Sequence, residues 1–327
     1  MTSTLPPDAI RPPPNMVVFG PDANCTLALC PVEMSVYGYQ PSLVANILFI
    51  ALYTLSMALH LYLGLRWKHW WFMGCMLVGG ANAIAGYVGR VLLHYNPFSF
   101  AAFMLQIICV TSGPVYYCAA IYVTLSNTIT ALTPTTTPTL SRLPPTLFYY
   151  IFIPSDLLSL VFQAAGGALS TESAGSSTLG VNLALAGLSL QVFTIVLFCG
   201  FFGDFLVRYF RVRKGGYEVG GYEVGGYEGV GDGMGTRPEG RRLKLFFGFM
   251  VLAVVLILVR CAYRLVELKE GYGGELVGNE ALFIGLEGVL VLVAVYCLMI
   301  AHPGFVFKRG RKDRSSAISQ QELQEYK

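Results

Sequence analysis

Seven stretches of almost uninterrupted apolar residues follow one another along the chain, separated by polar segments. Each stretch contains about 20 residues or more, the length of α-helix that crosses a bilayer core about 30 Å thick. A helix also satisfies its own backbone hydrogen bonds within lipid. The pattern therefore predicts an all-α integral membrane bundle of seven transmembrane helices. The expected spans are residues 43–65, 71–93, 100–125, 146–169, 179–205, 245–265 and 281–301.

Lysine and arginine gather on one side of these predicted spans, whereas the other side has little more than Arg11 and Lys269. Cytoplasmic loops of membrane proteins carry the excess of basic residues. We therefore expect the N-terminus outside and the C-terminus in the cytoplasm. The basic residues on the expected cytoplasmic side are Arg66, Lys68, Arg142, Arg208, Arg211, Arg213, Lys214, Arg237, Arg241, Arg242, Lys244, Lys308, Arg309, Arg311, Lys312 and Arg314.

Two features of the N-terminal segment agree with this orientation. Asn24, Cys25 and Thr26 form an N-glycosylation acceptor pattern, which requires a lumenal or extracellular position. Cys25 and Cys30 could close a small disulfide loop in the same oxidising space. The other cysteines fall within the spans and are interpreted as small buried apolar residues. No metal-binding motif and no cofactor motif is found in the sequence.

The composition excludes an ordinary soluble protein. Hydrophobic residues make up 54% of the 327 residues and charged residues only 13%, about half the usual share, and the mean hydropathy is +0.58. The net charge of +3 reports orientation rather than an acidic ligand, because the basic residues follow the topology. We therefore expect membrane lipids, and no nucleic acid, as partners.

Three parts are expected along the chain. Residues 1–42 form an extracellular proline-rich segment, residues 43–304 the transmembrane domain, and residues 305–327 a basic cytoplasmic tail. Within the domain, residues 211–242 contain repeats of Gly-Gly-Tyr-Glu-Val, a composition with no apolar face to bury, so a flexible cytoplasmic loop is expected there. This loop or the tail could bind a cytosolic partner, although the loop is interpreted first as a spacer.

Polar and charged residues recur inside the predicted spans, where an ionisable group is costly and usually functional or tightly paired. Asp156, Ser159 and Gln163 follow i, i+3, i+7 spacing and share one helix face. In the expected topology most of the charged residues fall in the outer half of the membrane, and Asp156 and Gln191 near its middle. The full set of candidate residues is Asn46, His60, Arg90, Asp156, Ser159, Gln163, Gln191, Arg260, Arg264, Glu267, Glu280 and Glu287.

Two interpretations of this set remain open, and both can hold at once. The arginines could pair with the glutamates to lock the bundle. Alternatively, the charges could line one chamber open to the outer leaflet, where they would hold a zwitterionic or amino-alcohol head group. Pro114 in the third span is expected to bend that helix, either as a hinge beside the chamber or as a packing kink.

An ordered series of short motifs across residues 37–304 resembles the fungal lipid-translocating exporter family, whose members include proteins of aminocholesterol resistance and of sphingoid long-chain base export. The resemblance implies seven helices in a fungal membrane and a role in lipid movement or in resistance to toxic amphiphiles. The residues that carry it are Tyr37-Gly38-Tyr39-Gln40-Pro41-Ser42, Asn46, His60, Gly86-Tyr87, Arg90, Pro114, Ala119, Tyr122, Asp156, Ser159, Gln163, Gly166, Gly187, Gln191, Arg260, Arg264, Glu267, Gly271, Glu280, Glu287 and His302-Pro303-Gly304.

Two positions depart from the family pattern. Ala83 stands where the family usually has an acidic residue, and Glu287 stands where it tends to have an aspartate. The first departure removes a charge that could pair with an arginine, and the second preserves a carboxylate. The resemblance also implies that the plasma membrane is the location.

Three function classes were compared. An exporter or flippase of amphiphilic lipids, passive or ion-coupled because no ATP-binding phosphate loop is found, is the first. A seven-helix lipid sensor that signals to a cytosolic partner is the alternative. An intramembrane hydrolase is disfavoured, because a zinc amidase needs several histidines and an acid, whereas His60, His69, His94 and His302 lie at scattered depths. The chain is therefore not expected to be an enzyme.

Overall fold

The computed structural model describes residues 16–132, 142–172, 178–213, 240–270 and 276–306. Within these ranges the fold is entirely helical, and seven helices are long and apolar enough to cross a membrane. The fold class expected from the sequence is confirmed to that extent. The helices are η1 (Val32–Met34), α1 (Leu43–Trp67), α2 (Trp70–Tyr95), α3 (Phe100–Leu132), α4 (Pro145–Glu172), α5 (Thr178–Arg213), α6 (Gly240–Glu270), α7 (Glu280–Leu282), η2 (Phe283–Val289), α8 (Leu290–Ile300) and α9 (Pro303–Val306).

Several helices are longer than the apolar stretches that predicted them. α5 has 36 residues, about 54 Å at 1.5 Å per residue, which exceeds the hydrocarbon thickness. α5 and α6 therefore include both ends of the predicted 211–242 loop, and its middle, 214–239, lies outside the described residues. Residues 1–15 of the expected N-terminal segment and 307–327 of the expected tail lie outside them too.

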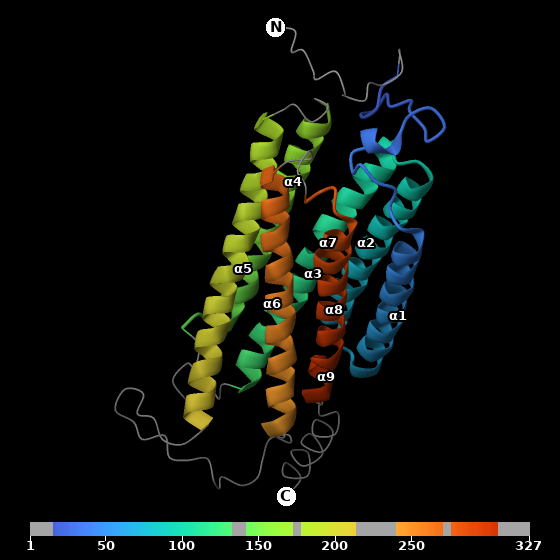
Figure 1. Ribbon diagram of the computed structural model, residues 1–327. Helices are drawn as coiled ribbons and strands as arrows, with labels where there is room; N and C mark the ends of the chain where they lie inside the picture. Colours follow the sequence, from blue (N-terminus) through green and yellow to red (C-terminus); the bar gives the residue numbers. More distant parts are fainter. Residues whose placement is uncertain (1–15, 133–141, 173–177, 214–239, 271–275, 307–327) are drawn as a thin grey trace, which may run out of the picture.

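The helices pack mainly in neighbouring pairs, with α3 joining the two sides of the bundle. α1 packs on α2, α2 on α3, α3 on α4, α4 on α5 and α6 on α8. Figure 1 shows α4 and α5 together at one side, α1 and α2 at the other, and α3 between them. α3 is thus one connection between the two sides, and α6, which packs on both α5 and α8, is another.

Glycines allow the closest of these helix contacts, as is common in membrane bundles. A Cβ atom on Gly89 of α2 would lie 2.9 Å from the Ala102 carbonyl oxygen of α3. A Cβ atom on Gly187 of α5 would lie 2.6 Å from the Ser159 carbonyl oxygen of α4. Both contacts are with backbone, which cannot move aside as a flexible side chain can. These glycines therefore fix the distances between helices that carry the polar residues.

The segment before α1 packs on the bundle end at which α1 and α3 begin. This end is called the N-terminal rim, and the opposite end, where α9 lies, the C-terminal rim (Figure 1). A disulfide joins Cys25 and Cys30. Tyr37 packs on Phe103 of α3 with ring centroids 5.8 Å apart, and Gln40 Nε2 donates to the His94 carbonyl oxygen at 2.7 Å. The segment is thus attached to α2 and α3.

The seventh span is not a continuous α-helix. It begins with the short α7, capped by the Asn279 side chain, which accepts from the Ala281 and Leu282 amides. It then passes through the π-helical η2 before continuing as α8. A π-helical turn widens the helix and is frequent at functional sites. Glu287, one of the candidate residues, lies within η2.

Candidate functional site

The most buried ion pair among the described residues lies between α6 and η2. Arg260 Nε lies 2.8 Å from Glu287 Oε2, and the two side chains are 0% and 1% exposed. Arg260 Nη2 also donates to the Val110 carbonyl oxygen of α3 at 3.1 Å. This carbonyl lies one turn before Pro114, whose ring leaves carbonyls in that region without their usual amide partner. The pair therefore ties α6, η2 and α3 together.

A second pair lies directly beside the first. Arg264 Nη1 lies 2.6 Å from Glu267 Oε2, and Arg264 Nε lies 3.9 Å from Glu287 Oε1. Arg260, Arg264, Glu267 and Glu287 are called the Arg–Glu cluster. Its two positive and two negative charges balance, which suits a low-dielectric interior where an unbalanced charge would be costly. These four residues form ion pairs, as expected if they lock the bundle, and they also lie together, as expected if they line one site.

Arg90 forms a neighbouring group at the N-terminal rim. Its guanidinium lies 3.7 Å from the Phe283 ring centroid, donates to the Tyr39 hydroxyl at 3.0 Å and approaches Glu280 at 3.6 Å. Glu280 Oε1 in turn accepts from the Ser42 amide at 2.6 Å. The single cation thus links α2, the seventh span and the segment before α1 through charge and aromatic contacts.

The phenol of Tyr39 belongs to the same group and lies before the first span. Burial raises the pKa of Tyr39 above its usual value, and the Arg90 guanidinium opposes this shift. The hydroxyl therefore stays protonated at neutral pH, as a neutral acceptor for Arg90 that brings no further negative charge to the rim.

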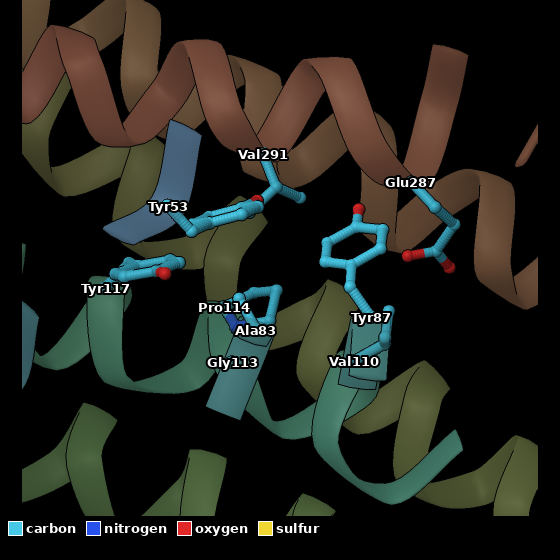
Figure 2. Close-up of a pocket in the computed structure, with 9 residues that line it drawn as sticks. All are labelled: Tyr53, Ala83, Tyr87, Val110, Gly113, Pro114, Tyr117, Glu287 and Val291. Atoms are coloured by element: carbon cyan, nitrogen blue, oxygen red, sulfur yellow. The ribbon is translucent and has the colours of Figure 1, made fainter. Parts of the chain in front are cut away.

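A small cavity lies beside the Arg–Glu cluster, between α1, α2, α3 and the seventh span. Figure 2 shows the Glu287 carboxylate facing the Tyr87 ring at one end of this cavity, with Tyr53 and Tyr117 at the other. Glu287 Oε1 has no hydrogen-bond partner among the described residues. The other residues that line the cavity are Ala83, Val110, Gly113, Pro114 and Val291.

Polar residues of α4 and α5 form a separate set. The Tyr122 hydroxyl of α3 donates to Asp156 Oδ2 at 2.9 Å. Ser159 Oγ donates to the Asp156 carbonyl oxygen at 2.7 Å, and Gln163 Nε2 donates to Gln191 Oε1 at 3.0 Å. These residues lie away from the Arg–Glu cluster, because their stripe on α4 faces α3 and α5.

Asn46 and His60 of α1 are also separate from the charged cluster. Asn46 Nδ2 donates to the Ser42 carbonyl oxygen at 2.6 Å at the start of the helix. His60, 14 residues further along, packs against Phe72 with ring centroids 5.9 Å apart. The structure thus divides the predicted residues into several groups instead of joining them in one chamber. Of the charged candidates, Glu287 alone lines the cavity described above.

The tyrosines of this cavity were not selected from the sequence as site residues. Tyr53 lies seven residues after Asn46 and seven before His60, so the three share one buried face of α1. This seven-residue spacing is the feature of the sequence that indicates a buried position for Tyr53. Ala83 and Glu287, the two departures from the family pattern, line the same cavity.

Comparison with known proteins agrees with the family expected from the motifs. The family model described as RTA1 like protein matches residues 76–310. The sphingoid long-chain base transporter RSB1 of Saccharomyces cerevisiae is 33% identical over 288 residues, which cover 83% of this chain and 74% of that protein. No solved structure matches the chain.

More distant relatives share the same region. Protein RTM1 of Saccharomyces cerevisiae is 28% identical over 233 residues, 70% of this chain and 65% of that protein. Protoporphyrin uptake protein 1 of the same yeast is 25% identical over 229 residues, 70% of this chain and 66% of that protein. The family model and the long matched region together show that this chain belongs to the RTA1-like family of membrane proteins.

Proposed function

We propose that this protein moves sphingoid long-chain bases or related amphiphilic lipids across a membrane and so confers resistance to toxic amphiphiles. The family and the similarity to a protein named as a sphingoid long-chain base transporter support membrane lipid transport. The observation that carries the proposal further is the carboxylate of Glu287, which is buried in the bundle beside a cavity and has one oxygen without a hydrogen bond among the described residues. Such a group can receive a positively charged head group.

The arrangement of Glu287 suits a transient partner. Arg260 holds Oε2 at 2.8 Å, and Arg264 approaches Oε1 only at 3.9 Å. The cavity measures only about 10 Å³, about the space of one water molecule, so the helices around it would have to separate before an ammonium group could reach Oε1, with Arg260 keeping the carboxylate in place. The tyrosine rings of the cavity would contact the apolar part of the ligand. In this proposal the Arg–Glu cluster binds the polar head group transiently as the lipid passes through the bundle. No covalent chemistry is involved.

Flux measurement in vesicles tests the proposal. The purified chain is reconstituted into liposomes, and labelled sphinganine is followed from one leaflet to the other. We expect flux above that of protein-free liposomes, and a loss of about tenfold or more in Arg264→Ala and Glu287→Gln, since each change removes a charge from the cluster. Absence of protein-dependent flux contradicts transport, and binding without flux favours a lipid sensor instead.

We also propose that the N-terminus faces the exterior of the plasma membrane and the C-terminus the cytoplasm. The distribution of basic residues supports this orientation. Asn24 is exposed, and its Oδ1 accepts from the Val17 amide at 2.7 Å, so the acceptor asparagine lies on the surface of an ordered turn.

Glycosylation of Asn24 tests this orientation. We expect the chain made in a fungal host to lose apparent mass on endoglycosidase treatment, and Asn24→Gln to abolish the shift. Thr26→Ala should abolish it as well, whereas Thr26→Ser should retain it, because a hydroxyl at this position completes the acceptor pattern. A wild-type chain without the shift, together with a C-terminal tag that external antibody reaches, would show the opposite orientation.

A further inference from the structure

A second carboxylate inside the bundle lines a groove that the Arg–Glu cluster does not reach. The groove has a volume of about 170 Å³ and lies between α2 and α4, with α3 as its floor. Trp71 and Cys75 come from α2, Tyr116 and Ala119 from α3, and Asp156 and Leu157 from α4. Tyr116 and Ala119 follow Pro114 on the chain, so this groove and the cavity beside Glu287 lie on different faces of the same part of α3.

Asp156 is the only acidic residue among those that line the groove. The residue is 1% exposed and its Oδ1 atom is covered by neighbouring side chains, so a ligand in the groove reaches this oxygen only when those side chains move. Tyr122 satisfies Oδ2, but Oδ1 has no hydrogen-bond partner within the described part of the chain. No ion pair joins Asp156 to a basic residue of the described ranges either. A buried carboxylate with one unsatisfied oxygen and no cation is unfavourable, so Asp156 takes up a proton when the groove is empty, and a ligand that brings a positive charge would stabilise the ionised form.

The rest of the groove is suited to a hydrocarbon chain. Trp71 and Leu157 at its edges are 56% and 50% exposed on the apolar surface of the bundle. The groove therefore opens toward lipid, and a chain longer than the groove can leave between these two side chains into the bilayer. Anionic head groups are disfavoured, because they would meet the carboxylate without a cation beside it.

We propose that this groove binds the ammonium group of a long-chain primary amine, with Asp156 Oδ1 as its acceptor and the alkyl chain passing out between Trp71 and Leu157. The choice of ligand rests on the proposed function, since sphingoid bases are amines of this class. The site itself is defined by Asp156 and is distinct from the cavity at Glu287. Tyr122 acts as a positioning residue, because its hydroxyl fixes the other carboxylate oxygen.

Equilibrium binding with two matched ligands tests the site. The purified full chain in nanodiscs is titrated with tritiated sphinganine and with tritiated N-acetylsphinganine, which has the same chain but a neutral amide, and uptake by empty nanodiscs is subtracted. We expect the amine to bind about tenfold or more tightly than the amide, since a charge-assisted hydrogen bond is lost in the amide. In Asp156→Asn this preference should fall by about tenfold, and any preference that remains belongs to the separate carboxylate of Glu287.

Control variants separate the site from a change in folding. Tyr122→Phe removes the hydrogen bond that positions the carboxylate but keeps its charge, so the preference for the amine should fall by less than in Asp156→Asn. Ala119→Leu fills the groove and should weaken binding of the amine about tenfold with Asp156 intact. Ala164→Leu, at an exposed alanine of α4 that does not line the groove, should bind as wild type does. Each variant is compared only after its thermal unfolding shows a folded bundle.

Two results would overturn the site: a wild-type chain that binds the amine and the amide equally, or a folded Asp156→Asn variant whose preference for the amine is undiminished. If Asp156→Asn does not fold, unchanged amine binding in Ala119→Leu overturns the site instead. The flux assay tests the transport proposal separately from the Asp156 site. If the amine preference depends on Asp156 but no flux is seen, the site is supported and the transport proposal is contradicted. If flux is seen without this preference, transport is supported and the site is contradicted.

Discussion

Replacing Arg260 or Glu287 singly by leucine is expected to destabilise the folded bundle by about 3–5 kcal/mol, because either change leaves the other charge buried without its partner. The two side chains are almost fully excluded from solvent and lie 2.8 Å apart. The lost free energy should appear as a lower midpoint in thermal or denaturant unfolding of the detergent-solubilised protein. Flux of sphinganine should fall to background in both variants.

The double variant Arg260→Leu with Glu287→Leu distinguishes stability from transport. Removing both charges takes away the unpaired group, so most of the lost stability should return, while flux should stay at background because the carboxylate at the cavity is absent. A more exposed ion pair provides the control. Arg208 and Asp204 lie 2.9 Å apart and are 37% and 33% exposed. Arg208→Leu should therefore lower the free energy of unfolding by only about 0–1 kcal/mol. Single variants at Arg260 and Glu287 that unfold like wild type would contradict this account.

Replacing Arg90 by methionine is expected to release the segment before α1 from the bundle. The change removes the donor to Tyr39 and the cation beside Glu280 and Phe283. We expect a loss of about 1–3 kcal/mol, less than for the Arg260–Glu287 pair, because Glu280 is 26% exposed and water can solvate it. Backbone amides of residues 37–42 should exchange with deuterium at least about tenfold faster.

Two conservative variants show which contact of Arg90 matters. Arg90→Lys keeps a charge for Glu280 but lacks the flat guanidinium that lies over Phe283, so its exchange rates should fall between wild type and Arg90→Met. Tyr39→Phe loses only one hydrogen bond and should change exchange slightly. If Arg90→Met left the exchange of residues 37–42 unchanged, the segment would be held by its apolar contacts alone.

The sequence was sufficient for the number and order of the spans, because each had to supply about 20 apolar residues to cross lipid. It was also sufficient for contacts within one helix. Arg264 and Glu267 are three residues apart and do pair. On α1 the polar residues Asn46 and His60 mark the buried face correctly, since both are buried in the structure.

The arrangement of the helices around one another could not be predicted in the same way. In water an apolar stripe shows which face of a helix is buried, but in a bilayer the lipid-facing side is equally apolar. Hence nothing in the pattern showed that Arg260 would pair with Glu287 rather than with Glu280, or that Asp156 would face α3. The π-helical η2 was equally hidden, because it depends on packing and leaves the composition of the span unchanged.

The balance of charges in the Arg–Glu cluster has a consequence for energetics. Its four residues carry two positive and two negative charges, so a rearrangement that moves the cluster as a unit transfers no net charge across the electric field of the membrane. A single elementary charge would exchange about 2.3 kcal/mol with that field for every 100 mV. Movement of the cluster should therefore add no voltage dependence of its own to the flux, which leaves the charge of the cargo, of any coupled ion and of the residues outside the cluster to set it.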